Sequence, residues 1–241
     1  MTADVARIAQ ITDTHFSAAL GVPSQWPSTV AWLRADRPDL LVHTGDIVLE
    51  DPDDDADRRF AKELMEQSPV PYVVIPGNHD VGSYGEGTDR PRRIAAFRET
   101  WGGDHFVRDL AGWRLVGVDA YRLATATHDA WLRDAVSTGG PVLVFVHQPI
   151  HGDQVDGWQM IAGARAAFER AIAGADVRAV ASGHRHCART VGRAVWAPSL
   201  RLQADEMVEG ADPRPGLVEH VISADGGHHH RVVRPWELVT S

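Results

Sequence analysis

The sequence predicts an α/β fold built on mixed β-sheets. Short apolar runs typical of buried strands alternate along the chain with stretches of helical pattern, which is the order expected of sheets covered by helices. Phe106–Leu110 and Trp113–Val118 instead alternate with period two on either side of Ala111-Gly112, so they predict an antiparallel hairpin and hence a mixed sheet. Five of the strand-like runs end on a polar cluster, and in open α/β sheets ligands bind at the carboxyl ends of the strands.

The first half of the chain supplies three predicted strands and three predicted helices. Leu40–Thr44 is a short, mostly apolar run bounded by Pro38 and Gly45, which is typical of a strand buried in a parallel sheet. A helix opens at Pro27, where the hydroxyls of the first turn are candidate caps. The other predicted elements of this half are the strands Arg7–Thr12 and Pro71–Pro76 and the helices Arg58–Gln67 and Arg92–Thr100.

An acidic segment precedes the second helix. Glu50 to Asp57 holds six acidic residues in eight, but the spacing differs from that of an EF-hand calcium loop and no glycine stands at the turn position. We therefore expect a solvated loop whose carboxylates favour the N-terminus of the helix that follows.

The second half of the chain becomes rich in strands toward its end. Pro141–Val146 is a continuous apolar strand that ends on His147. His228-His229-His230 is interpreted as an exposed turn that leads into the last strand. The other predicted elements are the helices His128–Val136 and Ala162–Ala173 and the strands Arg178–Ala181, Ala188–Val191, Ala194–Ala197, Gly216–Ile222 and Arg231–Val233.

Length and composition fit one domain, residues 1–241. A chain of 241 residues with 44% hydrophobic content is long enough to bury one core, and no linker or repeat divides it. The formal charge of −9 argues against a protein that binds nucleic acid through a broad basic surface.

The chain also carries no sign of export or membrane insertion. The single Cys187 excludes an internal disulfide and suits a reducing compartment; we interpret it as a half-buried strand residue. A strand begins at Val5, which leaves no room for a signal peptide, and no apolar run approaches about 18 residues. We expect a soluble, cytoplasmic protein with no membrane partner.

The polar clusters at the strand ends have the composition of a metal centre. Each alone is ordinary turn chemistry, because Asp, Asn and Gly populate turns for conformational reasons. Together they offer carboxylate, amide and imidazole donors, a mixture that suits Mn, Fe or Zn, whereas Mg or Ca prefers oxygen alone. The clusters are Asp13-Thr14-His15, Gly45-Asp46, Gly77-Asn78-His79-Asp80, His147 and Gly183-His184-Arg185-His186.

The ordered set D-x-H, G-D, G-N-H-D, H and G-H-x-H resembles that of the calcineurin-like metallophosphoesterase superfamily. The resemblance spans roughly residues 6–200, and the residues of the motifs are most similar to those of the class III cyclic-nucleotide phosphodiesterases. It implies a four-layer αββα fold, in which mixed β-sheets pack as a central sandwich flanked by helices. It also implies two bound metal ions of the divalent or Fe/Mn/Zn type.

The resemblance assigns a role to each matching residue. It implies that one metal is held by Asp13, His15 and His186, that Asp46 bridges the two metals, and that the second is held by Asn78, His147 and His184. His79 would protonate the departing oxygen. Many members extend G-D to G-D-x-x-D, whose last Asp orients this histidine, but Leu49 stands there in this sequence. Asp80, through a contact with His79 or a backbone amide, is the candidate substitute.

The function that the resemblance implies is a metal-dependent phosphodiesterase. Its partner would be a small soluble phosphoester, with 3',5'-cyclic AMP or another cyclic nucleotide as a candidate, attacked by a metal-bridging hydroxide. Two alternatives stay open: a phosphomonoesterase or nucleotide pyrophosphatase on the same dimetal scaffold, and a non-catalytic interaction scaffold. A homodimer is also left open.

Other residues are interpreted mainly as structural. His43 lies inside a predicted buried strand, and His105, His128 and His220 lack ligand-like spacing. Arg122, at a strand end, is interpreted as a surface arginine, with a contact to a phosphate or a base as the alternative. His151 is a candidate substrate contact at the rim of the site. Trp26, Trp32, Trp101 and Trp131 are expected in the core, and the loops Gly82–Arg90, Gly152–Gly163 and Gln203–Gly216 are expected to set specificity.

Overall fold

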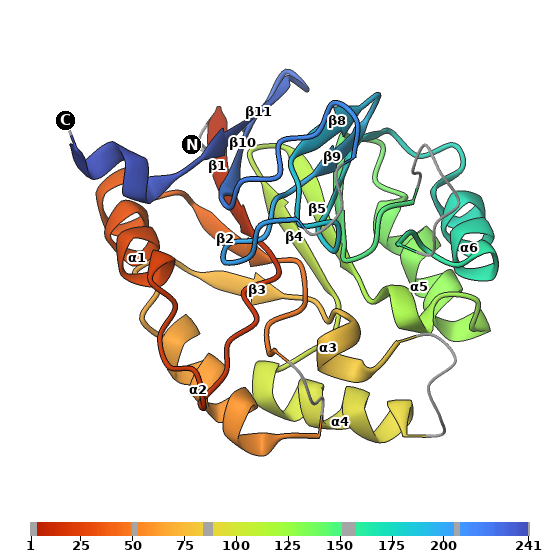
Figure 1. The fold of residues 1–241 in the computed structure, drawn as a ribbon. Helices are drawn as coiled ribbons and strands as arrows, with labels where there is room; N and C mark the ends of the chain where they lie inside the picture. The colour runs from red at the N-terminus through yellow and green to blue at the C-terminus, as the bar shows by residue number, and fades with distance from the viewer. Residues whose placement is uncertain (1–3, 50–52, 84–88, 151–157, 205–207, 241) are drawn as a thin grey trace.

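The computed structural model describes residues 4–49, 53–83, 89–150, 158–204 and 208–240 (Figure 1). Two mixed sheets form its centre. The first contains β1 (Val5–Ile11), β2 (Leu40–His43), β3 (Tyr72–Val74), β10 (Leu217–Ser223) and β11 (His228–Val233), in the order β11-β10-β1-β2-β3. The second contains β4 (Phe106–Leu110), β5 (Trp113–Val118), β6 (Val142–Val146), β7 (Val177–Ser182), β8 (Arg189–Val191) and β9 (Ala194–Trp196), in the order β4-β5-β6-β7-β9-β8.

Helices cover the outer faces of both sheets (Figure 1). They are α1 (Gln25–Asp36), α2 (Asp55–Met65), α3 (Asn78–Val81), α4 (Arg90–Trp101), α5 (Ala126–Val136) and α6 (Ala162–Ile172), with 3-10 turns η1 (Ala120–Arg122) and η2 (Pro235–Thr240). Among the helices in the described ranges, none has both the length and the apolar composition that a membrane crossing requires.

The core lies in three layers between these elements. Ile8 and Val42 of the first sheet pack against Phe145 of the second, so the inner faces of the two sheets form one apolar layer. Trp26 of α1 belongs to the layer outside the first sheet, and Phe168 of α6 belongs to the layer outside the second. This confirms the four-layer αββα fold, with the sheets packed as a central sandwich.

Parallel pairing brings the strand ends together. β1 pairs in parallel with β2, and β2 with β3; in the other sheet β5, β6 and β7 pair in parallel. Carboxyl ends of parallel neighbours lie at the same edge of a sheet. The antiparallel hairpin β4–β5 and the antiparallel strand β10 make both sheets mixed, as the sequence predicts.

Four helices, α1, α2, α4 and α5, begin two or three residues earlier than expected. α1 starts at Gln25, two residues before Pro27, and the Thr29 hydroxyl donates to the Gln25 carbonyl at 2.9 Å instead of capping the first turn. α2 starts at Asp55, because the Asp54 carboxylate accepts the backbone N–H of Ala56 at 2.7 Å and caps the helix. The acidic segment therefore forms the first turn of a helix in part, and its residues 50–52 lie outside the described ranges.

The histidine triplet is not a turn. His228 to His230 are the first residues of β11, with His230 opposite His220 on β10. The turn lies before them, where Gly226 takes a φ of 87° that favours glycine. The prediction of an exposed turn was wrong. His228 and His230 pack against His220 at the edge of the sandwich, and this tertiary contact overrides the local turn propensity.

The buried histidine of α5 should make stability depend on pH. His128 is 1% exposed and stacks on Trp131 at 5.0 Å between ring centroids, and burial followed by the charge of Arg122 lowers its pKa to about 4 from 6.5. Between these values the unfolded chain binds a proton that the native protein does not. The free energy of unfolding should therefore fall as pH falls through this window, by on the order of 3 kcal/mol for this residue.

Urea unfolding across the same window measures this effect. His128→Gln cannot take up the proton, so its unfolding free energy should depend less steeply on pH than that of the wild type. Parallel pH dependences of the two proteins would rule out His128 as a source of the slope.

Candidate metal centre

Backbone contacts join the strand-end clusters of both sheets. The Asp13 N–H donates to the Gly45 carbonyl at 2.9 Å, which links the ends of β1 and β2. The Gly183 N–H donates to the His147 carbonyl at 2.9 Å, which links the ends of β7 and β6. The His184 N–H donates to the Asp13 carboxylate at 3.0 Å and so connects one sheet to the other.

The backbone at these residues is strained. Of the eight non-glycine residues with positive φ in the described ranges, five belong to the predicted ligand set: Asp13, His15, Asp46, His184 and His186. The left-handed region costs an ordinary L-residue about 1–2 kcal/mol. Such strain persists where surrounding structure imposes it, and it gathers at functional sites. The left-handed backbone conformation of these residues therefore indicates that they have a function other than stabilising the fold.

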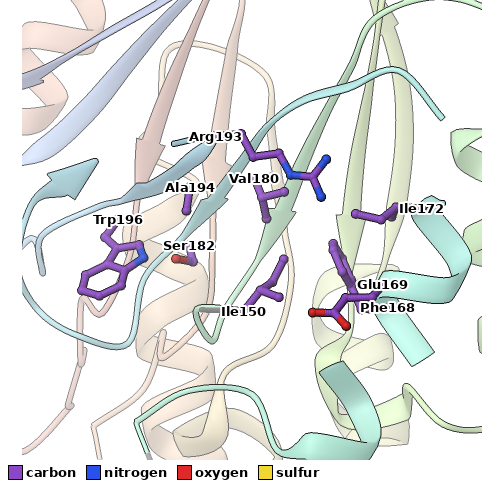
Figure 2. Close-up of a pocket in the computed structure, with 9 residues that line it drawn as sticks. All are labelled: Ile150, Phe168, Glu169, Ile172, Val180, Ser182, Arg193, Ala194 and Trp196. Atoms are coloured by element: carbon purple, nitrogen blue, oxygen red, sulfur yellow. The ribbon is translucent and has the colours of Figure 1, made fainter. Parts of the chain in front are cut away.

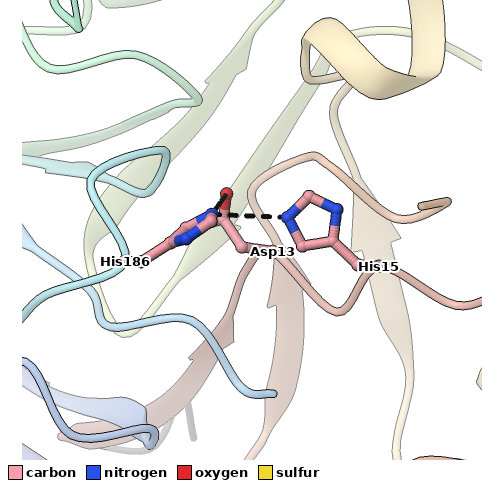
Figure 3. A group of neighbouring side chains, drawn as sticks. All are labelled: Asp13, His15 and His186. Carbon is pink, nitrogen blue, oxygen red and sulfur yellow. Dashed lines mark hydrogen bonds and ion pairs between the residues drawn. The ribbon is translucent and has the colours of Figure 1, made fainter. Parts of the chain in front are cut away.

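The first donor group contains Asp13, His15 and His186 (Figure 3). His186 Nε2 lies 3.2 Å from Asp13 Oδ1 and 3.3 Å from His15 Nε2. Asp13 Oδ1 and His15 Nδ1 are buried and make no hydrogen bond within the described residues. A carboxylate oxygen and two imidazole nitrogens that converge this closely are suited to share one cation.

The second donor group contains Asp46, His147 and His184, with Asn78 beside it. His147 Nδ1 lies 2.8 Å from the Thr44 carbonyl, so it must donate a hydrogen there. In the neutral ring this fixes the tautomer and leaves the lone pair on Nε2. Asn78 Oδ1, His184 Nδ1 and Asp46 Oδ2 lie 3.2, 3.1 and 3.3 Å from that nitrogen. Acceptors clustered around a lone pair again require a cation or a proton between them.

Asp46 and His15 connect the donor groups. A third group contains His15, Asp46 and His79, so Asp46 appears in two of the three groups. The His79 N–H donates to Asp46 Oδ1 at 2.9 Å, and its ring meets the His15 ring edge-on at 4.7 Å between centroids. The structure thus brings together all seven residues predicted as ligands, with His79 facing the same centre.

Three glycines allow this close approach. A Cβ on Gly77 would lie 2.1 Å from Asp46 Oδ1, and one on Gly183 would lie 2.0 Å from Thr12 Oγ1. Gly45 has a φ of 100°, and its Cβ would lie 2.6 Å from the Gly77 nitrogen. Any side chain at these positions would push the donor groups apart.

The carboxylates and imidazoles of the centre shift one another's pKa values. Burial alone would raise the pKa values of Asp13 and Asp46, but His186 and His147 respectively hold both well below the usual range. Burial opposes protonation of His147, yet the Asp46 carboxylate raises the pKa of that imidazole to about 9. The centre therefore contains two ionised carboxylates that attract positive charge.

Asp80 holds two loops of the centre together. Its carboxylate accepts the backbone N–H groups of Gly77 at 2.8 Å, Ile47 at 3.1 Å and Val48 at 3.3 Å. Burial, followed by the charge of Asp46, raises its pKa to about 7. Of the two contacts expected for Asp80, the structure shows the one with backbone amides, which fixes the turn that carries Asn78.

Comparison with known proteins agrees with this geometry. The sequence model described as "Calcineurin-like phosphoesterase" matches residues 6–188, which is most of the chain and includes every residue of the donor groups. The chain belongs to the calcineurin-like phosphoesterase family.

Curated relatives of this chain are distant. It is 29% identical over 176 residues to the bovine (Bos taurus) "Serine/threonine-protein phosphatase CPPED1", with 62% of this chain and 54% of that protein covered. It is 32% identical over 113 residues to "Uncharacterized protein YvnB" of Bacillus subtilis (strain 168), with 43% and 8% covered. The chain thus spans about half of the first relative and a small part of the second.

Solved structures share the fold of this chain at low sequence identity. A dimetal phosphatase from Danio rerio has a TM-score of 0.67 at 14% identity, with 95% of this chain and 96% of that chain covered. Purple acid phosphatase PPD1 from yellow lupin has a TM-score of 0.72 at 12% identity, with 98% and 52% covered. GAP50, described as the anchor in the inner membrane complex of Plasmodium, has a TM-score of 0.67 at 14% identity, with 97% and 85% covered. These likenesses support the fold.

The candidate metal centre also contains residues that the sequence did not single out. The Tyr121 hydroxyl lies 3.4 Å from Asn78 Oδ1, and the Trp158 ring lies 5.2 Å from that of His184. The Ser199 hydroxyl donates to the Asp13 carbonyl at 2.7 Å, and Arg201 donates to the His15 carbonyl at 2.5 Å. Tyr121 follows β5 as the predicted ligands follow their strands, and this strand-end position is a signal that it lies near the centre, although it does not identify Asn78 as its partner.

The residues interpreted as structural lie outside the donor groups. His43 is buried and bonds to the Thr14 hydroxyl at 2.9 Å. His220 is buried between Gln10 and His228, at 3.0 Å from each. Cys187 is buried in a bend rather than a strand. His151 lies outside the described residues, as do residues 84–88, 152–157 and 205–207 of the predicted specificity loops.

A small cavity beside α6 does not suit the chemistry (Figure 2). Its volume is about 20 Å³, and its walls include Ile150, Phe168 and Trp196. This is space for about one water molecule. No residue of the three donor groups lines it, so it is not a candidate substrate site.

Proposed function

We propose that the protein is a dinuclear metal-dependent phosphodiesterase that hydrolyses a small phosphoester, with a cyclic nucleotide such as 3',5'-cyclic AMP as the first candidate. The observation that carries the metal-dependent chemistry is the two donor groups Asp13–His15–His186 and Asp46–His147–His184, which a third group joins through His15 and Asp46. The preference for a diester is supported by the residues of the motifs, which are most similar to those of the class III cyclic-nucleotide phosphodiesterases.

The residues present fit two cations. Asp13, His15 and His186 would hold one, Asp46 would serve both, and Asn78, His147 and His184 would hold the other. The fit rests on two buried donor atoms that make no hydrogen bond to any described residue, on the fixed His147 tautomer, and on the oxygen–nitrogen donor set that suits Mn, Fe or Zn. When bound, such ions supply Lewis acidity to the phosphoryl oxygens and to an attacking water.

Two residues of the chain, Asp80 and His79, would position and assist the reacting groups beside these cations. Asp80 fixes the turn that carries Asn78 and His79 through its backbone contacts, so it is a positioning residue. His79 is half-buried on that turn, and its ring lies against His15 at the open side of the centre. An imidazole there would give a proton to the departing ester oxygen, because this side chain transfers protons near neutral pH.

A phosphomonoesterase is the second candidate. It is favoured by the bovine relative, whose name describes a serine/threonine-protein phosphatase. The donor groups serve both reactions, because both use an in-line displacement at phosphorus.

One substrate panel separates these candidates. The metal-stripped protein and the protein reloaded with Mn, Zn or Fe are assayed with bis-p-nitrophenyl phosphate, p-nitrophenyl phosphate and 3',5'-cyclic AMP. We expect activity only after metal is restored, with the diester preferred. A preference for p-nitrophenyl phosphate would favour the monoesterase, and no turnover with any metal would favour a non-catalytic scaffold.

A further inference from the structure

Two polar side chains lie inside the apolar layer between the sheets. Gln10 of β1 and His220 of β10 are both 0% exposed, and the His220 ring meets the Phe145 ring edge-on at 5.8 Å between centroids. Burial of polar groups is unfavourable unless they are paired. Within the described residues, each side-chain nitrogen and oxygen of Gln10 and His220 has a hydrogen-bond partner. The two side chains therefore form a completely paired polar contact in the middle of the sandwich.

The direction of each hydrogen bond in this contact is fixed. Gln10 Nε2 lies 3.3 Å from the Ser182 carbonyl and 3.0 Å from the Thr44 hydroxyl. A carbonyl only accepts, so the amide nitrogen of Gln10 faces Ser182 and its oxygen accepts from His220 Nε2 at 3.0 Å. Burial holds the pKa of His220 well below its usual range, so the ring is neutral and its Nδ1 accepts from His228 Nε2 at 3.0 Å. His220 thus determines which way the Gln10 amide points.

Both donor contacts of Gln10 reach strand ends that carry predicted ligands. Thr44 directly follows β2 and stands two residues before Asp46, and Ser182 ends β7 and stands two residues before His184. β2 belongs to the first sheet and β7 to the second. A single amide group therefore joins the two sheets at the edge where the second donor group forms.

The third member of that donor group depends on the same contact. The Thr44 carbonyl accepts the Nδ1–H of His147 at 2.8 Å, so a displacement of Thr44 would move this imidazole. We infer that Gln10 and His220 are positioning residues of the metal centre: the Gln10 amide, oriented by His220, holds the strand ends of the two sheets at the separation that lets the second donor group bind one cation. The inference rests on the two-cation centre of the proposed function and adds two residues to it.

Metal affinity tests this positioning role. Gln10→Met keeps the length of the side chain and removes both N–H donors. In calorimetric titrations of the metal-free protein with Mn²⁺, we expect at least one binding step to weaken by about tenfold, the lower end of the effect of losing a contact that orients a metal ligand. Thr29→Val is the matched control, because it also removes a buried hydrogen bond, from Thr29 of α1 to the Gln25 carbonyl. Wild-type affinity in Gln10→Met, or an equal loss in Thr29→Val, would overturn the inference.

A double variant separates positioning from stability. Gln10→Met combined with His220→Phe replaces the polar pair by apolar side chains, and removing both partners of a buried hydrogen bond is often nearly neutral for stability. We expect urea unfolding to show recovered stability while the affinity for Mn²⁺ stays low. Recovery of metal affinity together with stability would overturn the positioning role, because the pair would then act only on the fold.

Hydrogen exchange of the metal-free protein gives a measurement that does not depend on metal binding. The Gly183 N–H, which donates to the His147 carbonyl at 2.9 Å, should exchange faster in Gln10→Met. The Arg114 N–H, which donates to the Pro141 carbonyl at 3.0 Å at the far end of the same sheet, should change less. An equal acceleration at both amides would report global destabilisation and overturn the inference. If the wild type binds fewer than two ions, the two-cation proposal fails, and this comparison still decides whether Gln10 holds the strand ends.

Discussion

Asp46→Ala should lose both metal ions and nearly all turnover. Asp46 belongs to two of the three donor groups and lies 3.3 Å from His147 Nε2, so its removal weakens both halves of the centre together. Loss of a supporting contact alone lowers metal affinity by about 10–100-fold, and loss of a shared ligand should exceed that. Metal content by mass spectrometry and kcat/KM measure the effect.

A second test variant and a control accompany Asp46→Ala. Gly77→Ala keeps every donor side chain, but its Cβ would lie 2.1 Å from Asp46 Oδ1, so it should also reduce metal content by displacing that carboxylate. Asp57→Ala is the matched control, because Asp57 is a buried aspartate on α2 whose carboxylate accepts the Ala18 N–H at 2.7 Å, away from the centre. Full metal occupancy in Asp46→Ala would contradict a shared carboxylate.

His79→Ala should keep its metal and lower turnover by about 10²–10⁴, the usual effect of losing a general acid. The loss should be greater for an alkyl leaving group than for p-nitrophenolate, because a stable anion departs without a proton. Turnover on both ester types and metal content measure the effect.

The same variant separates two roles for His79. Because His79 forms a donor group with His15 and Asp46, a metal ligand at this position would show as lost metal in the variant. His229→Ala is the control, since His229 is an exposed histidine on β11. An equal loss for alkyl and nitrophenyl esters would contradict proton donation to the leaving group.

Much of the fold could be predicted because strand and helix patterns are local. The hairpin Phe106–Leu110 and Trp113–Val118 has the predicted bounds, and β6 differs by one residue at its start. Two of the missed features depend on distant contacts. β11 begins at His228 because it pairs with β10, and the short helix α3 was missed because Asp80 closes it through amides of a different loop.

The ligand set could be predicted as a set of donors, but the arrangement around it could not. Nothing in the local sequence of Tyr121 indicates that its hydroxyl meets Asn78, 43 residues earlier in the chain. Nor does the sequence of α4 alone show that Arg90 faces Tyr121 rather than solvent. Both contacts depend on how α4 and η1 pack at the edge of the sandwich.

By itself the sequence determined which donor atoms are available and that they follow strands, because side-chain chemistry and apolar periodicity are properties of neighbouring residues. Only the tertiary structure decided that Asp46 serves two donor groups and that five of the predicted ligands take left-handed backbone conformations. These features arise from contacts between remote segments, such as that of Asp13 with His184, 171 residues apart, and no local pattern encodes such a distance.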